Sequence, residues 1–522
     1  MKKNYFILIS MVAVLGAVWF AVQETPKQFS DRAPRIEAKV SQVVDLKNGD
    51  TFDLTASIVE KNIAGNKVKM LAYNGSIPGP TIRVPKGAEI TINFTNNTDT
   101  ETTLHSHGVR LDNKFDGVPG LTQEAIGVGK TFTYKIKFPD EGVYWYHPHI
   151  REDYAQELGL YGTYVVVSDK PDYWSPVNRE VPLMVDDILI ENGKVAPFGS
   201  TADHTLMGRF GNTMLVNGET NYSLSARKGE VVRFLITNVA NTRTFNLSFS
   251  GAKMKLVGAD GGKYERETFV DSVILGPSER AIVEVLFDKS GTYTIEHKTP
   301  QKTYIMGSVS VSGDTATSTY KQQFYVLRMN KDTIAVFDQL RQYFDKKVDK
   351  SIRLTVDMGG MGSMGGGSHM MSGGSQMGDG MMGGGTGDNS KIEWEDTMVT
   401  MNQMATTNMV KWKIVDEDTK KENMDIDWRF KVGDKVKIKI FNDPKSMHPM
   451  QHPIHFHGQQ FIVLSTNGIK NTNLVWKDTT LVRIGDTVEI LLNVTNPGVW
   501  MAHCHIAEHL ESGMMMKFEA TQ

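Results

Sequence analysis

Three stretches of the chain share one layout and indicate its fold: VPKGAEITINFTN at Val84–Asn96, ARKGEVVRFLITN at Ala226–Asn238 and FKVGDKVKIKIFN at Phe430–Asn442. In each, a glycine is followed by a strand-like run and by an asparagine nine positions after the glycine. Alternating runs bounded by Gly, Pro, Asn and Asp are typical of β-sandwiches and barrels. A second set of similar stretches lies roughly 60 residues further along: DEGVYWYHPH (Asp140–His149), KSGTYTIEHK (Lys289–Lys298) and TNPGVWMAHCH (Thr495–His505). The repeats predict an all-β chain built from three copies of one unit.

Length and composition bound the answer further. The 522 residues fit about three domains. Hydrophobic residues make up 40% of the chain and charged residues 22%, which excludes a wholly disordered protein. The formal net charge of −3 provides no basic field, so no nucleic-acid partner is expected. The single cysteine excludes an intramolecular disulfide bond.

Residues 1–23 have the features of a signal peptide or an N-terminal membrane anchor. Lys2 and Lys3 precede an apolar run at 6–22, whose length lies between a long signal core and a short spanning helix. Ala21-Val22-Gln23 matches a cleavage site poorly, which keeps the anchor open as an alternative. Both interpretations place the rest of the chain outside the cytoplasm, in the periplasm, at the cell surface or secreted. Membrane contact is expected only through this segment, if it is not cleaved.

Ten of the 14 histidines fall into four clusters. The clusters are HSHG (His105, His107), HPH (His147, His149), HPIHFHG (His452, His455, His457) and HCHIAEH (His503, His505, His509). Residues i and i+2 of a strand point to the same side, so each H-x-H pair presents two imidazoles side by side. Four such pairs favour transition-metal binding over the alternative of surface histidines on strands.

The lone cysteine lies within one of these clusters. On a strand, Cys504 points away from His503 and His505, so one strand carries a thiolate to one site and two imidazoles to another. The electron path between the two sites is then only a few bonds long. The candidate ligands of the thiolate site are Cys504, His452, His509 and, as a weak axial thioether, Met514. This set matches a blue-copper electron-transfer site better than structural zinc.

The remaining eight clustered histidines divide evenly between the first and third copies. Where the first copy reads LHSHG, the second reads LSFSG at Leu247–Gly251, and the stretch matching HPH retains only His297. The second copy is therefore interpreted as a spacer without metal ligands, and His297 as a surface residue. The eight-histidine site is predicted to form where the first and third copies meet.

With these four motifs in this order, the chain after residue 37 resembles the multicopper oxidases, specifically their three-domain laccase-like and cuprous-oxidase members. Asn74-Gly75 and Pro78-Gly79-Pro80 also resemble the family's first-domain signature. The resemblance implies three tandem cupredoxin-like domains, each a Greek-key β-sandwich or barrel, at 37–170, 178–313 and 325–522. It also implies four copper ions: one type 1 copper and a cluster of one type 2 and two type 3 coppers that reduces O₂ to water.

The resemblance assigns a role to each motif residue. It gives the type 1 copper to His452, Cys504, His509 and Met514, with Cys504 as the electron relay. It gives the type 2 copper to His105 and His455, one type 3 copper to His107, His147 and His505, and the other to His149, His457 and His503. Asp116 matches the family's carboxylate near the cluster and is a candidate proton donor, with a turn-forming Asp-Gly as the alternative. Two residues depart from the family. Ser106 makes the first motif HSHG, where HWHG is commoner, and Leu510 stands where many bacterial members have a proton-relaying glutamate.

A Met- and Gly-rich stretch at 358–387 interrupts the third copy. It is predicted to be a mobile loop, because it lacks the residues that form a core. Thioethers are soft ligands suited to Cu(I). The methionines predicted to capture Cu(I) are Met358, Met361, Met364, Met370, Met371, Met377, Met381 and Met382, followed on the C-terminal flank by Met398, Met401, Met404 and Met409. The alternatives are a low-complexity linker for the stretch and, for the flank, methionines at the spacing of core residues.

Three functions fit these features. The favoured one is oxidation of Cu(I) or another metal ion coupled to the four-electron reduction of O₂ to water, which would serve copper tolerance. The first alternative is a laccase that oxidises phenols or aromatic amines. The second is a non-catalytic copper-binding cupredoxin scaffold.

Overall fold

The computed structural model describes residues 36–359 and 391–522. The expected leader at 1–23 and all but the first two residues of the expected loop at 358–387 lie outside these ranges. Strands dominate the described residues, which confirms the all-β class. Within the described ranges, no helix combines the length and the apolar character needed to cross a membrane.

The strands form three pairs of sheets, which we call the first, second and third modules. The sheets of the first module are β1 (Val43–Asp45), β4 (Thr81–Pro85), β9 (Gly162–Val167), β8 (Gly142–His147), β6 (His105–His107), and β3 (Asn66–Tyr73), β2 (Thr51–Ile63), β5 (Glu89–Asn97), β7 (Thr131–Lys137). Those of the second are β13 (Thr213–Val216), β10 (Arg179–Ile188), β15 (Glu230–Asn238), β20 (Arg280–Phe287), β17 (Lys253–Ala259), β18 (Gly262–Val270), and β14 (Tyr222–Lys228), β22 (Thr303–Thr315), β21 (Gly291–Lys298), β16 (Phe245–Phe249), β19 (Val273–Leu275). Those of the third are β24 (Lys411–Asp416), β23 (Lys350–Asp357), β26 (Lys435–Asn442), β31 (Thr487–Asn493), β28 (Gln460–Thr466), β29 (Ile469–Lys470), and β25 (Asp427–Lys431), β33 (Met515–Thr521), β32 (Gly498–Cys504), β27 (His452–Phe456), β30 (Thr479–Val482).

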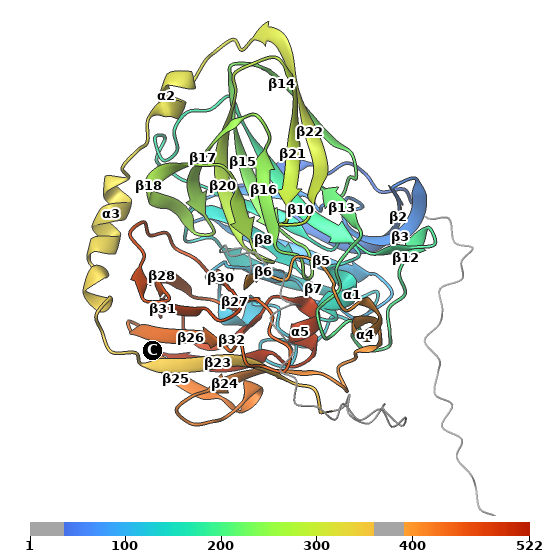
Figure 1. Cartoon of the computed structure of the whole chain (residues 1–522), viewed down its shortest axis with the longest axis vertical. Helices are drawn as coiled ribbons and strands as arrows, with labels where there is room; N and C mark the ends of the chain where they lie inside the picture. The colour runs from blue at the N-terminus through green and yellow to red at the C-terminus, as the bar shows by residue number, and fades with distance from the viewer. Residues whose placement is uncertain (1–35, 360–390) are drawn as a thin grey trace, which may run out of the picture. The chain divides into compact units, whose positions relative to one another are not determined.

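The remaining elements are short connectors. They are the hairpin β11 (Ile190–Glu191) and β12 (Lys194–Val195), the helices α1 (Glu152–Ala155), α2 (Lys321–Tyr325), α3 (Lys331–Asp338), α4 (Val399–Met404) and α5 (Ala507–Glu511), and the 3₁₀ turns η1 (Asn113–Phe115), η2 (Arg341–Tyr343) and η5 (Asn423–Asp425). Figure 1 shows α2 and α3, in yellow, running along one side between the strands of the second module and those of the third.

The three repeated stretches supply the central strands β5, β15 and β26. Each pairs in parallel with one neighbour (β2, β10, β23) and antiparallel with the other (β7, β20, β31). The sheets are therefore mixed rather than purely antiparallel. Parallel partners cannot be joined by a tight hairpin and need a longer connection. Between β2 and β5, for example, the chain forms β3 and β4.

The repeated asparagine holds the loop that follows each central strand. Its buried side-chain amide donates to two backbone carbonyls: Asn96 to Thr100 (2.8 Å) and Ile126 (2.8 Å), Asn238 to Arg243 (2.8 Å) and Leu275 (2.9 Å), and Asn442 to Met450 (2.6 Å) and Val482 (3.0 Å). Buried carbonyls without donors destabilise a fold, so this contact fixes the loop. In the first and third modules, the fixed loop leads directly to a histidine motif.

The histidine motifs lie on adjacent strands in register. In the first module, His105 of β6 lies opposite His147 of β8, and in the third, His455 of β27 lies opposite His503 of β32. Directly opposite residues on antiparallel strands are close neighbours on the same face of the sheet. Each of these modules therefore presents paired imidazoles on one sheet.

At the corresponding strand pair, the second module combines a leucine with a histidine. Leu247 of β16 lies opposite His297 of β21. The prediction of a surface position for His297 is wrong, because its side chain is fully buried and stacks on Tyr304 with the ring centroids 5.6 Å apart. Its Nδ1 accepts a hydrogen bond of 3.0 Å from the Asn246 backbone, and burial lowers its pKa to about 3. His297 is therefore a neutral core residue.

Candidate metal centres

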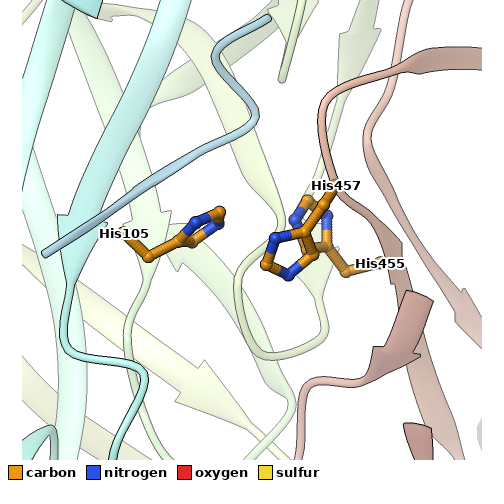
Figure 2. A group of neighbouring side chains, drawn as sticks. All are labelled: His105, His455 and His457. Atoms are coloured by element: carbon orange, nitrogen blue, oxygen red, sulfur yellow. The ribbon is translucent and has the colours of Figure 1, made fainter. Parts of the chain in front are cut away.

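Eight histidines from the first and third modules meet in one buried group, which we call the histidine cluster: His105, His107, His147, His149, His455, His457, His503 and His505. Ring contacts cross the seam between the modules. The ring centroids of His105 and His457 are 4.1 Å apart, and those of His107 and His455 are 3.7 Å apart. Figure 2 shows the His105 ring facing those of His455 and His457. The structure thus brings together all eight histidines that the sequence placed at this seam.

Hydrogen bonds from Nδ1 orient five of the eight rings. The contacts are His105 to the Asp116 carbonyl (2.6 Å), His147 to the Pro148 carbonyl (2.7 Å), His455 to the Asp478 carbonyl (2.9 Å), His503 to the Cys504 carbonyl (2.8 Å) and His457 to Asp116 Oδ2 (2.9 Å). These oxygens only accept, so Nδ1 of each neutral ring carries the proton and Nε2 keeps its lone pair. Proteins commonly orient metal-binding histidines in this way.

The other three rings are held differently. His107 is reversed, since its Nε2 lies 3.0 Å from Asp478 Oδ1 and 3.1 Å from Thr479 Oγ1 and its Nδ1 has no hydrogen-bond partner among the described residues. His149 Nδ1 lies 3.2 Å from Glu152 Oε1. Neither ring nitrogen of His505 has a hydrogen-bond partner in the described part of the chain.

The free nitrogens fit bound cations. No described residue is a hydrogen-bond partner of Nε2 in the buried rings of His105, His147, His149, His455 and His505. The Nε2 atoms of His457 and His503, both with lone pairs, lie 3.0 Å apart. Such lone pairs repel unless positive charge lies beside them, and unpartnered buried nitrogens are costly. The donor set therefore suits imidazole-bound transition-metal ions.

Burial keeps the rings neutral, the form that binds metal. Burial, followed by repulsion from neighbouring rings, holds five pKa values well below the ordinary value for histidine: those of His107, His147, His149, His455 and His503. Burial lowers the pKa of His505 to about 3. It lowers the pKa of His457 to about 4, although the adjacent Asp116 opposes this shift.

A second buried group, which we call the thiol triad, consists of Cys504, His452 and His509. Cys504 Sγ lies 3.5 Å from His452 Nδ1 and 3.9 Å from His509 Nδ1, and the two nitrogens are 3.4 Å apart. The Trp412 ring stacks on His509 with centroids 4.0 Å apart and covers the triad. Burial raises the pKa of the Cys504 thiol, so a thiolate here requires a bound cation. Two imidazole nitrogens and one sulfur at these distances suit a copper site.

Met514 lies beside the triad. Its carbonyl accepts a 3.0 Å hydrogen bond from the Cys504 N–H, and its side chain is fully buried in the same core as Cys504. One segment joins the two groups, because Cys504 ends β32 and is flanked by His503 and His505 of the histidine cluster. The His503 ring also donates to the Cys504 carbonyl, which adds a hydrogen-bonded route to the covalent one.

Asp116 is buried between two rings of the histidine cluster. Its Oδ2 accepts from His457, and its Oδ1 lies 3.4 Å from His105 Nδ1. Burial alone would raise the pKa of Asp116, but the two neighbouring histidines hold it below its usual range. The side chain is therefore a carboxylate that faces the histidine cluster.

Sequence reasoning missed three acidic groups on α1 and α5, of which Glu152 contacts the histidine cluster. Glu152 of α1 contacts His149, and burial, followed by repulsion from Glu511, raises its pKa well above the usual range. Burial, followed by repulsion from Asp153, raises the pKa of Glu508 and Glu511 on α5 to about 7. The only sequence signal for Glu152 was its position three residues after His149. The neighbouring Leu510 packs against Val118 and Met501 and has no polar role.

Most methionines of the expected capture loop lie outside the described residues. Met358 follows β23 directly and packs, with Met398 and Met409, against the core that contains Cys504 and Met514. Met401 and Met404 lie on α4 and are 40% and 56% exposed. The flank therefore carries thioethers packed against the core that contains Cys504 as well as thioethers exposed to solvent.

Three family models, each described as multicopper oxidase, match residues 56–171, 175–323 and 393–522. The chain is 28% identical over 467 residues to multicopper oxidase mco of Staphylococcus aureus, a match that covers 88% of this chain and 85% of the relative. It is also 23% identical over 593 residues to copper resistance protein A of Escherichia coli. This match covers 89% of this chain and 92% of the relative.

Solved structures share the fold. A multicopper oxidase from Campylobacter jejuni, titled a metallo-oxidase, matches with a TM-score of 0.67 and 24% identity, over 94% of this chain and 98% of the other. The likeness confirms the expected three-domain, cupredoxin-like fold.

Proposed function

Because this chain belongs to the multicopper oxidase family, we propose that it couples the one-electron oxidation of a reducing substrate to the four-electron reduction of O₂ to water. The observation that carries the proposal is the continuity of one segment. It supplies Cys504 to the thiol triad and His503 and His505 to the histidine cluster. An electron that enters at the triad therefore has a path of a few bonds to the cluster.

The proposed ligands follow the two groups. His452, Cys504 and His509, with Met514 as a fourth and weaker ligand, would hold a type 1 copper. His105 and His455 would hold a type 2 copper, and two trios would hold the type 3 pair: His107, His147, His505 and His149, His457, His503. In support, the ligand nitrogens of His149, His457 and His503 lie within 4.8 Å of one another. When bound, the coppers supply one-electron transfer at the triad and reduction of O₂ at the cluster.

The chain itself orients the ligands and excludes water. The Nδ1 contacts to carbonyl and carboxylate oxygens turn the free Nε2 atoms inward. Burial keeps the imidazoles neutral and limits the access of water to the site. Trp412 covers His509.

We assign to Asp116 the transfer of protons at the histidine cluster. Asp116→Asn keeps an oxygen that can accept from His457 but cannot hold a proton. We expect Asp116→Asn to bind copper normally but to turn over roughly 100-fold or more slowly. This is the usual contribution of a positioned acid or base to the rate. The exposed Asp112→Asn is the matched control and should behave like the wild type. Copper loss in Asp116→Asn that parallels the activity loss would contradict the proton role and leave only ring orientation.

Cu(I) is the proposed substrate, with copper tolerance outside the cytoplasm as the physiological role. Three features support this. The soft thioethers of Met398, Met401 and Met404 lie on the segment that leads into Trp412, the residue that covers the triad. The sequence carries eight further methionines at 358–387. One relative is named copper resistance protein A.

The substrate is tested by the double variant Met401→Leu/Met404→Leu, which keeps apolar volume and removes two exposed thioethers. We expect KM for Cu(I) to rise roughly tenfold, equivalent to ~1.4 kcal/mol of binding, with turnover of a phenol unchanged. Met424→Leu, a 40% exposed methionine of η5, is the control. A variant lacking 361–387 is assayed in parallel. If neither change affects Cu(I) turnover, or if each lowers Cu(I) and phenol turnover equally, laccase activity is the better description.

A further inference from the structure

His107 is the exception in the histidine cluster. Five rings are tied through Nδ1 and turn Nε2 inward, whereas His107 is tied through Nε2 and leaves Nδ1 free. The group that imposes this reversal is Asp478, which directly precedes β30 of the third module. Its Oδ1 accepts from His107 at 3.0 Å and from Thr479 Oγ1 at 2.9 Å.

Asp478 is itself held by a residue of the second module. Arg280, the first residue of β20, contacts Asp478 Oδ1 through Nη1 at 2.7 Å and Oδ2 through Nη2. Both side chains are almost completely buried. A bidentate contact to a guanidinium fixes the plane of a carboxylate. A lysine ammonium, which acts as a point charge, cannot do this.

The remaining donors of Arg280 anchor it to two modules. Its Nε donates to the Val143 carbonyl in β8 of the first module at 2.9 Å. Its Nη1 donates to the Ser278 carbonyl at 3.0 Å, and its backbone N–H donates to Asp260 Oδ1 at 2.9 Å. These contacts fix the position of the Arg280 guanidinium, and they join the first and second modules to the third.

The H-x-H-G motif leaves the space that this contact occupies. Gly108, directly after His107, has φ +80°, where side chains are disfavoured. A Cβ at this position would overlap Asp478 Oδ2 and lie 3.1 Å from Arg280 Nη2. The glycine is required by the ion pair as well as by the turn.

We infer that Arg280 is a positioning residue for the histidine cluster: through Asp478 it holds the His107 ring with Nδ1, rather than Nε2, facing the other ligands. The second module, which has lost the clustered histidines, thus acts on the site instead of only separating its neighbours. The inference rests on the proposed function only in taking the histidine cluster as a copper site.

The test compares Arg280→Met and Arg280→Lys with Lys477→Met. Lys477 is a cation at the same seam that pairs with Asp260 and Glu279, 3.2 Å from each, and no contact joins it to the histidines in the described chain. In copper-loaded full-length protein challenged with a chelator, we expect Arg280→Met to hold copper in the histidine cluster about 10- to 100-fold less tightly. The Cys504 absorption band should stay. Arg280→Lys should recover part of the loss, and Lys477→Met should match the wild type. Equal losses in Arg280→Met and Lys477→Met, or no loss in either, would overturn the inference.

Arg280→Met leaves Asp478 as an unpaired buried charge, so the double variant Arg280→Met/Asp478→Asn, which removes both charges, is measured beside it. The inference expects this neutral pair to fold and still to retain cluster copper poorly. Full recovery of copper binding would show that Arg280 only supports folding. Histidine ring NMR of the metal-free chain reads the tautomer directly: the His107 proton should reside on Nε2 in the wild type and be redistributed in Arg280→Met. If the wild type shows this tautomer but binds no cluster copper, the proposed function fails and the positioning role stands.

Discussion

Replacing Cys504 with serine is expected to remove the intense visible absorption of the copper-loaded protein and to lower substrate oxidation at least about 1,000-fold, or ~4 kcal/mol in the activation free energy. A serine hydroxyl is a harder and far less acidic ligand than a thiol, so it cannot replace the thiolate between His452 and His509. The histidine cluster should keep its copper, because Cys504 contributes only a backbone carbonyl to it.

Visible spectra, copper content and turnover check this prediction together. Met516→Leu is the matched control, since Met516 is buried in the same core and lies outside the triad. The control should keep both the absorption band and the turnover. A Cys504→Ser protein that still turns over at more than a tenth of the wild-type rate would exclude the triad as the electron entry site.

Replacing His457 with alanine should produce the reciprocal result. His457 contacts His503 through Nε2 and Asp116 through Nδ1, so its loss opens the cluster on both sides of the module seam. We expect cluster copper to be lost and O₂ consumption to fall at least about 1,000-fold, while the Cys504 absorption band remains.

Copper content, the visible band and O₂ uptake distinguish this outcome from unfolding. His297→Ala removes a buried histidine of the second module and serves as the control, with normal copper content expected. Simultaneous loss of the visible band in His457→Ala would mean that the two groups are not separate copper sites.

Much of this arrangement could be predicted from the sequence because strand geometry is regular. The two-residue spacing of His105 and His107 fixes which side of a strand they share. The same rule, applied to Cys504, places its sulfur away from the flanking rings. The glycine-to-asparagine repeat predicted three equivalent units, and the two carbonyl contacts of Asn96, repeated by Asn238 and Asn442, give its physical reason.

The rest depends on contacts between residues far apart in the sequence. Nothing in the spacing of His107 indicates that its Nε2 is tied to Asp478, 371 positions away, or that Arg280 holds that carboxylate. His297 was placed at the surface because its module lacks partner histidines, but the packing of Tyr304 buries it. The contact of Glu152 with His149, by contrast, joins residues only three positions apart, but no periodic pattern marks the turn that brings them together.

Copper-edge anomalous diffraction from crystals of the copper-loaded full-length protein locates each copper ion. We expect four peaks: one bonded to Cys504, His452 and His509, and three enclosed by the eight rings of the histidine cluster. A single copper, or peaks that leave the 3.0 Å pair of His457 and His503 without a metal, would contradict this expectation.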